Sequence, residues 1–262
     1  MRRKKRKNIM AELLMILLMV IIIFPLYFMV VNSLKVHEEY VVNMVGMPAQ
    51  ATFQNYIEAF QGKPFGQWIW NSFFLTAAAT LVTAAVALLC GYAFAKMEFK
   101  GKNFLFQCII PLMSVPPVAM IIPQFRLIKV MGLVNTRVSV ILIYVGIMLP
   151  MTIYLMRNFM KTVPDSLIDA ARIDGCSSLK ALCKIMVNIV WVWNELLISL
   201  VFLQKESLRT LMVGITLFKG RFTLNIPVIM AGLVIATVPI VFVYIFAQKY
   251  LIEGMLAGSV KE

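Results

Sequence analysis

The sequence predicts an all-α integral membrane protein with six transmembrane helices. Of the 262 residues, 61% are hydrophobic and only 14% are charged, whereas soluble domains usually carry about 25% charged residues. The apolar residues gather in long runs without the alternation of a membrane β-barrel. A helix of about 20 apolar residues crosses the bilayer core and satisfies its own backbone there. The six runs are Met10–Val31, Asn71–Ala95, Phe104–Phe125, Val138–Met156, Ile185–Leu203 and Ile226–Ala247.

The first three runs differ in character. Met10–Val31 is too long for the apolar region of a signal peptide, and no small-residue cleavage pattern follows it, so we expect it to remain as the first span. The second run is rich in alanine, which permits close packing of membrane helices. The third run contains Pro111, Pro116, Pro117 and Pro123. Because proline removes a backbone donor, we expect a kinked helix that lines a cavity or flexes.

The basic residues predict the orientation of the chain. Six consecutive basic residues, Arg2 to Lys7, precede the first span, and most others lie in short loops. With the N-terminus inside, 16 of the 25 basic residues face the cytoplasm, so both termini are predicted there. Lys205, Arg209, Lys219 and Arg221 nevertheless crowd one external loop. The formal net charge of +13 therefore reflects membrane topology, and nucleic-acid binding is not expected.

We expect two parts along the chain: a basic cytoplasmic N-terminus over residues 1–9 and a single transmembrane domain over residues 10–262. No catalytic constellation is visible, since the phosphate-binding loop and the zinc-protease and serine-hydrolase motifs are all absent. Cys90, Cys108, Cys176, Cys183 and His37 lack metal-ligand spacing. The sequence thus predicts no catalytic residues, no metal and no cofactor.

A polar segment over residues 164–184 interrupts the membrane-like pattern. Pro164 is a helix-start signal, and Asp165 and Ser166 fall in the first turn, where a carboxylate opposes the helix dipole. Gly175 permits a tight turn, and a second helix can start near Ser177. We therefore expect a helix–glycine–helix element on the cytoplasmic face whose apolar side needs a partner. The alternative is an amphipathic loop lying on the membrane surface.

At this segment the chain resembles a known family. Asp169-Ala170-Ala171-Arg172-Ile173-Asp174-Gly175 is similar to the EAA motif of permease subunits from bacterial ABC importers, with Asp169 where that family usually has glutamate. The resemblance implies that this segment forms a coupling helix that docks on the ATPase subunit. Asp169, Ala170, Ala171, Asp174 and Gly175 are therefore our predicted ATPase-coupling residues.

The resemblance extends over nearly the whole chain. Trp193-Asn194-Glu195 is similar to a segment in the fifth span of the carbohydrate-importer branch, and 251–261 looks like that branch's C-terminal tail. Asn32-Ser33-Leu34-Lys35 follows the first span as in that branch. A carboxylate within a span is costly unless it is paired, interfacial or facing water. Trp193, Asn194 and Glu195 are therefore predicted to line the translocation path or to anchor a helix interface. The alternative for Asn194 and Glu195 is a packing hydrogen bond or an end-of-helix position.

One departure from the family concerns the fifth span. Relatives usually place a further Pro-containing apolar segment between the coupling helices and the Trp-Asn-Glu stretch. Here Met186-Val187-Asn188 runs almost directly into Ile189-Val190-Trp191. Residues 176–203 are barely enough for a second coupling helix and a full span. We therefore expect either a short, tilted fifth helix or the loss of the second coupling helix. An in-frame deletion or a degenerate copy would produce either result.

The resemblance implies the permease subunit of an ATP-driven importer for a sugar or oligosaccharide in the bacterial cytoplasmic membrane. Its implied partners are a second, homologous permease subunit, a cytoplasmic ABC ATPase dimer, an extracellular solute-binding protein and membrane lipid. ATP would be hydrolysed by the separate ATPase subunits. Two alternatives remain: a secondary transporter or channel that needs no ATPase, and a transport-impaired scaffold subunit whose fifth span is damaged by the deletion.

Overall fold

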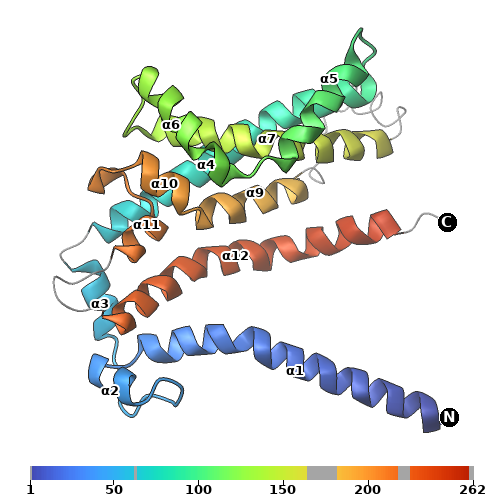
Figure 1. Ribbon diagram of the computed structural model, residues 1–262. Helices are drawn as coiled ribbons and strands as arrows, with labels where there is room; N and C mark the ends of the chain where they lie inside the picture. The colour runs from blue at the N-terminus through green and yellow to red at the C-terminus, as the bar shows by residue number, and fades with distance from the viewer. Residues whose placement is uncertain (1, 62–63, 164–181, 218–224, 260–262) are drawn as a thin grey trace. The chain divides into compact units, whose positions relative to one another are not determined.

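The computed structural model describes residues 2–61, 64–163, 182–217 and 225–259 (Figure 1). Over these ranges all regular structure is helical, which confirms the predicted all-α class. The elements in order are α1 (Arg2–Ser33), α2 (His37–Val42), α3 (Gln54–Phe60), α4 (Phe65–Lys96), α5 (Lys102–Ile109), the 3-10 helices η1 (Ile110–Ser114) and η2 (Pro117–Met120), α6 (Ile121–Val130), α7 (Arg137–Thr162), α9 (Leu182–Asn194), α10 (Leu197–Phe202), the 3-10 helix η4 (Glu206–Leu208), α11 (Leu211–Thr216) and α12 (Ile226–Ser259).

Four of the six predicted spans are helices long and apolar enough to cross a membrane. They lie in α1, α4, α7 and α12 and cover Ile9–Ser33, Phe65–Lys96, Arg137–Thr162 and Ile226–Phe246. The predicted third and fifth spans are not continuous helices. The described residues therefore contain four candidate spans, or five if the bent third segment is one span, and the count of six is not confirmed.

The third predicted span is broken rather than gently kinked. Lys102–Ser114 and Pro117–Val130 are bent by 98° relative to each other, and Figure 1 shows the bend as a V with α5 on one arm and α6 on the other. The break falls at Val115 and Pro116, which have extended backbone angles. Pro111, Pro116 and Pro117 cannot donate backbone hydrogen bonds, so the α-helical ladder gives way to the short 3-10 helices η1 and η2.

The fifth predicted span is also interrupted. Its first part lies in α9, which the structure describes from Leu182 to Asn194. The helix stops before Glu195 and Leu196, and α10 adds only six residues. Residues 185–203 are therefore divided between α9 and α10, and over its described residues neither helix is a candidate span.

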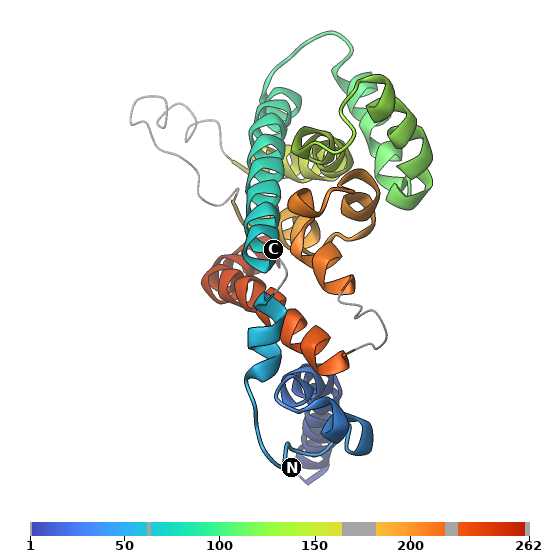
Figure 2. The ribbon, with the colours of Figure 1, turned by 90° about the vertical axis from the view of Figure 1, so that its left-hand side faces the viewer.

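The chain divides into two compact units. The first comprises Met1–Phe65 and Ile215–Val238, and the second comprises Gly66–Gly214 and Pro239–Glu262. In the second unit α7 packs against α9, α10 and η1. Figures 1 and 2 show α4 running alongside α7. The core of this unit contains Leu75, Ala79, Ile128, Val140, Ile143, Tyr144, Val145, Met148, Val192, Ile198, Phe202 and Leu203.

In the first unit, polar contacts close the end of α1. Lys35 is fully buried, and its Nζ donates to Asn32 Oδ1 at 3.1 Å and to the Asn43 carbonyl at 2.7 Å. Asn55 Nδ2 donates to the carbonyls of Ser33 and Lys35 at 2.8 and 2.7 Å. These donors satisfy carbonyls that a helix C-terminus leaves without partners. The Asn32-to-Lys35 stretch therefore attaches the segment that follows α1 to the end of that helix.

Candidate functional site

The predicted coupling residues Asp169, Ala170, Ala171, Asp174 and Gly175 lie outside the described residues, as does most of the 164–184 segment. Their role stays a prediction. The structure describes the two positions where the segment joins the rest of the chain. It follows Val163 at the end of α7, and its last three residues, 182–184, lie in α9.

The entry to this segment is attached to α4. Lys96, the last residue of α4, donates from Nζ to the carbonyl of Val163 at 2.7 Å. Nearly two turns earlier on α7, the Arg157 guanidinium carbon lies 3.8 Å from the centre of the Phe106 ring of α5, a cation–π contact. Arg157 Nε also donates to the Phe94 carbonyl at 3.4 Å. These contacts hold the ends of α4 and α7 and the start of α5 together.

An apolar cluster supports the same joint. Phe94 and Phe106 pack edge to face with their ring centres 5.6 Å apart, a favourable arrangement for aromatic pairs. At Gly91 the helices approach so closely that an added Cβ would lie 2.6 Å from Met156 Cβ. Only glycine fits there without displacing α7, so movement at the end of α7 is coupled to α4 by direct packing.

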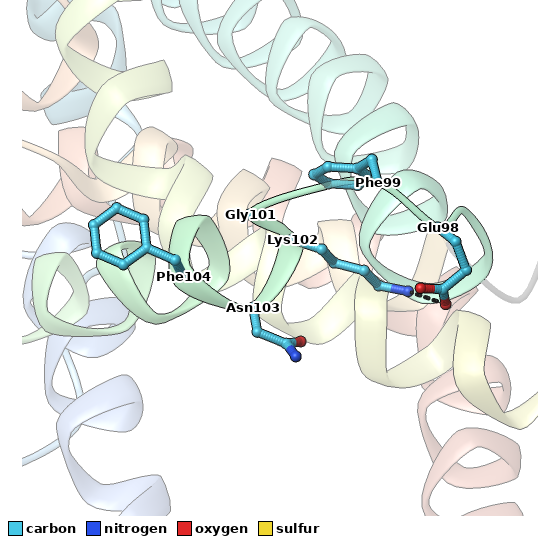
Figure 3. A pocket seen from close by; sticks show the side chains of 6 residues that line it. All are labelled: Glu98, Phe99, Gly101, Lys102, Asn103 and Phe104. Carbon is cyan, nitrogen blue, oxygen red and sulfur yellow. Dashed lines mark hydrogen bonds and ion pairs between the residues drawn. The ribbon is translucent and has the colours of Figure 1, made fainter.

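An open hollow of about 310 Å³ lies at the turn between α4 and α5 (Figure 3). Glu98 and Lys102 form an ion pair of 3.0 Å on its rim, and the Glu98 side chain is 92% exposed. Gly101 makes the turn with a positive φ of 83°. An exposed ion pair of this kind contributes little to stability, and the hollow contains no set of groups that fits a cofactor.

Glu195 occupies the break between α9 and α10. Its carboxylate accepts hydrogen bonds from the backbone N–H groups of Ile198 at 2.8 Å and Ser199 at 3.1 Å, at the free N-terminal end of α10. The buried Tyr144 of α7 donates its hydroxyl proton to Glu195 Oε2 at 2.6 Å. The Ser199 hydroxyl lies 2.7 Å from the same Tyr144 oxygen. Glu195 therefore caps α10 and links it to α7.

The other two predicted residues face different surroundings. Trp193 is buried at 6% exposure, whereas the Asn194 side chain is exposed and donates to the Val190 carbonyl at 2.8 Å. Tyr144 also packs edge to face against Trp191, with ring centres 5.5 Å apart. About two turns before the break, Asn188 donates to Thr152 of α7 at 3.0 Å.

Sequence reasoning missed the partners on α7. Tyr144 and Thr152 lie in an apolar run, and no sequence pattern in that run marks either hydroxyl as the partner of another helix. The only available signal was the polarity of Glu195 and Asn188 themselves, since a buried polar group in a membrane helix requires a partner. Within the described ranges no group of His, Cys, Asp and Glu is arranged to hold a metal ion. The arrangement consists of two parts. Packing and polar contacts hold α4, α5 and α7 together, and the Glu195 carboxylate caps α10 at the break after α9.

Comparison with known proteins identifies the family. The model of the family described as "Binding-protein-dependent transport system inner membrane component" matches residues 86–256, more than half of the chain. The chain belongs to this family. Its members are membrane components of transport systems rather than enzymes, which fits the candidate spans in α4, α7 and α12.

Family members named for sugar uptake are similar over most of the chain. The sulfoquinovosyl glycerol transport system permease protein SmoH of Agrobacterium fabrum is 31% identical over 253 residues, covering 91% of this chain and 89% of that protein. The melibiose/raffinose/stachyose import permease protein MelC of Bacillus subtilis is 30% identical over 251 residues, with 90% and 91% covered. The resemblance to sugar ABC importer permeases is thereby confirmed. A secondary transporter or channel is not favoured.

The fold of a solved ABC importer chain is also shared. A chain from the crystal structure of a bacterial ABC transporter involved in the import of the acidic polysaccharide alginate matches with a TM-score of 0.81 and 21% identity. The match covers 95% of this chain and 98% of that chain. At this identity the likeness concerns the fold alone.

Proposed function

We propose that this chain is the pore-forming permease subunit of an ATP-driven importer that moves a sugar or oligosaccharide across the bacterial cytoplasmic membrane by alternating access. The observation that carries the proposal is the similarity of some nine tenths of the chain to import permeases named for sugars. The proposed assembly contains a second, homologous permease subunit, a cytoplasmic ATPase pair that hydrolyses ATP, and an extracellular solute-binding protein.

In this proposal the 164–184 segment docks on the ATPase, with Asp169, Ala170, Ala171, Asp174 and Gly175 at the contact. The described joint supports this role. Val163 directly precedes the segment, so movement of the segment would act on Val163 first. The carbonyl of Val163 accepts a hydrogen bond from Lys96 of α4. Arg157 connects the same end of α7 to Phe106 of α5. A displacement of the docked segment would therefore shift α4, α5 and α7 as one body.

The proposed orientation puts both termini and the 164–184 segment in the cytoplasm. The distribution of basic residues supports it, because 16 of 25 then lie inside. Within the Trp193-Asn194-Glu195 stretch, we assign the exposed Asn194 to the translocation path. We assign Glu195 to the helix interface with α7, which its hydrogen bond with Tyr144 supports, and the buried Trp193 to the protein interior.

A second candidate is a transport-impaired subunit that supports assembly only. Two observations favour it. The alignment with the Agrobacterium relative spans 253 positions, whereas 91% of 262 residues is about 238, so about 15 aligned positions have no residue here. The predicted fifth span is also interrupted at Glu195 and Leu196, between α9 and α10. In this second proposal the unmatched positions belong to a deletion before Trp193.

Reconstitution of the assembly in proteoliposomes tests the proposal. We expect Asp169→Lys and Gly175→Pro to lower oligosaccharide uptake about 5- to 150-fold, the factor that 1–3 kcal/mol of lost coupling free energy produces, while ATP hydrolysis persists. The control is Glu98→Lys, which reverses a carboxylate that is 92% exposed and should leave uptake unchanged. Wild-type uptake in both coupling variants would contradict the coupling role.

The same experiment separates the two candidates. An assembly that forms but transports nothing supports the assembly-only subunit, and a family-like insert after Val187 should then raise uptake. Robust uptake by the unmodified chain, unchanged by the insert, excludes impairment.

A further inference from the structure

One end of the second unit is built as a fixed polar platform. The loop over residues 203–210 is attached there to the start of α4. Trp68 Nε1 donates to the Glu206 carbonyl at 3.1 Å. Asn71 Nδ2 donates to the carbonyls of Ser207 and Arg209, both at 2.9 Å. Trp68 and Asn71 are 1% and 0% exposed, so the loop backbone is pinned by buried side chains.

The turn between α6 and α7 joins the same platform. Asn135 has a positive φ of 59°, and its Oδ1 accepts from the backbone N–H groups of Gln204 at 2.7 Å and Lys205 at 3.2 Å. At the first residue of α7, Arg137 Nη2 donates to Asn71 Oδ1 at 2.7 Å. Three segments far apart in sequence therefore meet here: the start of α4, the turn from α6 into the start of α7, and the loop.

Most of the charged residues in this platform are basic. Its described segments (66–74, 126–137 and 203–210) contain five basic residues and one acidic residue, Glu206. Glu206 reaches Arg209 only at 4.0 Å, and the buried Nε of Arg137 has no hydrogen-bond partner among the described residues. Arg126, Lys129 and Lys205 are exposed. We call these five residues the basic platform: Arg126, Lys129, Arg137, Lys205 and Arg209.

Membrane topology does not account for these charges. In the proposed orientation the platform lies outside, and basic residues normally concentrate on the cytoplasmic side. A fixed set of like charges instead attracts an oppositely charged partner and accelerates its encounter. The pinned loop also lowers the ordering cost of binding, because its backbone is already held. A rigid arrangement of this kind suits a folded protein surface better than fluid lipid headgroups.

We propose that the basic platform is the docking surface for an acidic face of the extracellular solute-binding protein. This inference rests on the proposed function, which supplies the partner, and adds the place of contact and the sign of the partner's surface. Arg137 and Arg209 form the centre, since Asn71 accepts from the Arg137 guanidinium and holds the backbone carbonyl of Arg209. Lys129 and Lys205 extend the charge toward solvent.

The test uses the purified importer assembly in nanodiscs of zwitterionic lipid and the solute-binding protein encoded beside the permease. The variant is Lys129→Glu combined with Lys205→Glu, two exposed side chains whose reversal leaves the buried network intact. We expect its Kd to rise by roughly tenfold or more at low salt and the salt dependence of binding to flatten. Basal ATP hydrolysis should not change. Lys100→Glu, at the opposite end of α4, is the control and should bind like the wild type.

Each other result has a distinct meaning. Wild-type Kd and salt dependence in the double variant would overturn the platform while leaving the proposed function standing. A variant effect that appears only in nanodiscs containing anionic lipid would assign the platform to lipid and overturn the proposal. A wild-type assembly that binds no solute-binding protein would overturn the proposed function itself.

Discussion

The hydrogen bond between Tyr144 and Glu195 makes the sharpest stability prediction. Tyr144→Phe removes one of the three donors to the Glu195 carboxylate and leaves the ring in place. Hydrogen bonds to charged groups contribute about 1.5–3 kcal/mol in soluble proteins, and side-chain bonds between membrane helices reach about 1.7 kcal/mol at most. With an O···O distance of 2.6 Å, we expect a loss of about 1–2 kcal/mol.

Glu195→Ala should cost more than Tyr144→Phe. It removes the acceptor for the N–H groups of Ile198 and Ser199 as well as for the tyrosine hydroxyl. Each buried donor without a partner costs about 1–3 kcal/mol, so the loss is expected at about 3–5 kcal/mol. The double variant should lose less than the sum, because Tyr144 has no carboxylate to bond once Glu195 is gone. The difference is the coupling energy, expected at about 1–2 kcal/mol.

Thermal unfolding of the purified assembly measures these losses. For a chain of this size, 1 kcal/mol lowers Tm by about 2–4 °C, so Tyr144→Phe should lower it by about 2–8 °C. Tyr154→Phe is the matched control on α7, where the ring stacks on Phe106 at 6.3 Å between ring centres and the change should be small. Equal Tm values for the two phenylalanine variants, or strictly additive losses in the cycle, would refute the proposed link between α7 and α10.

Two further substitutions test the packing described above. Gly91→Ala should lower Tm because the new Cβ would lie 2.6 Å from Met156 Cβ, and overpacking of this kind costs about 1–3 kcal/mol; Gly146→Ala, where an added Cβ meets nothing within 4 Å, is the control, and equal Tm values would contradict the close approach. Lys35→Met removes the donor to Asn32 and Asn43, so limited proteolysis should cut the 36–53 segment faster than in the wild type, and an unchanged cleavage rate would show that the segment is held in another way.

Hydropathy could locate the spans because it depends on composition over a whole bilayer thickness. Four predicted runs became long helices, since each supplies enough apolar residues and no cluster of prolines interrupts it. The proline cluster predicted a kink in the third run but not its angle of 98°. The angle is set by two consecutive extended residues, Val115 and Pro116, together with packing against α7, and packing is not visible in a local pattern.

Only part of the candidate site could be predicted from the sequence, for a similar reason. Glu195 stood out because a carboxylate in an apolar run demands an explanation. Its partner Tyr144 is 51 residues away, and nothing in its neighbourhood of apolar residues marks it. The same holds for the platform, where Asn71 contacts carbonyls 136 and 138 residues later in the chain. Pairings across such separations follow from the fold and cannot be derived from spacing.

The helix break after α9 depends on the Glu195 carboxylate. Backbone groups at membrane depth must find partners inside the protein, and an interruption at residues 195 and 196 frees the first N–H groups of α10. Glu195 accepts two of them, so the interruption is tolerated where the carboxylate is present. This requirement holds equally for a transporting subunit and for one that only assembles. A Glu195 variant therefore tests the helix break, whereas uptake by the unmodified chain separates the two functions. Asp169 and Gly175 test the docking on the ATPase, because their proposed role is confined to it.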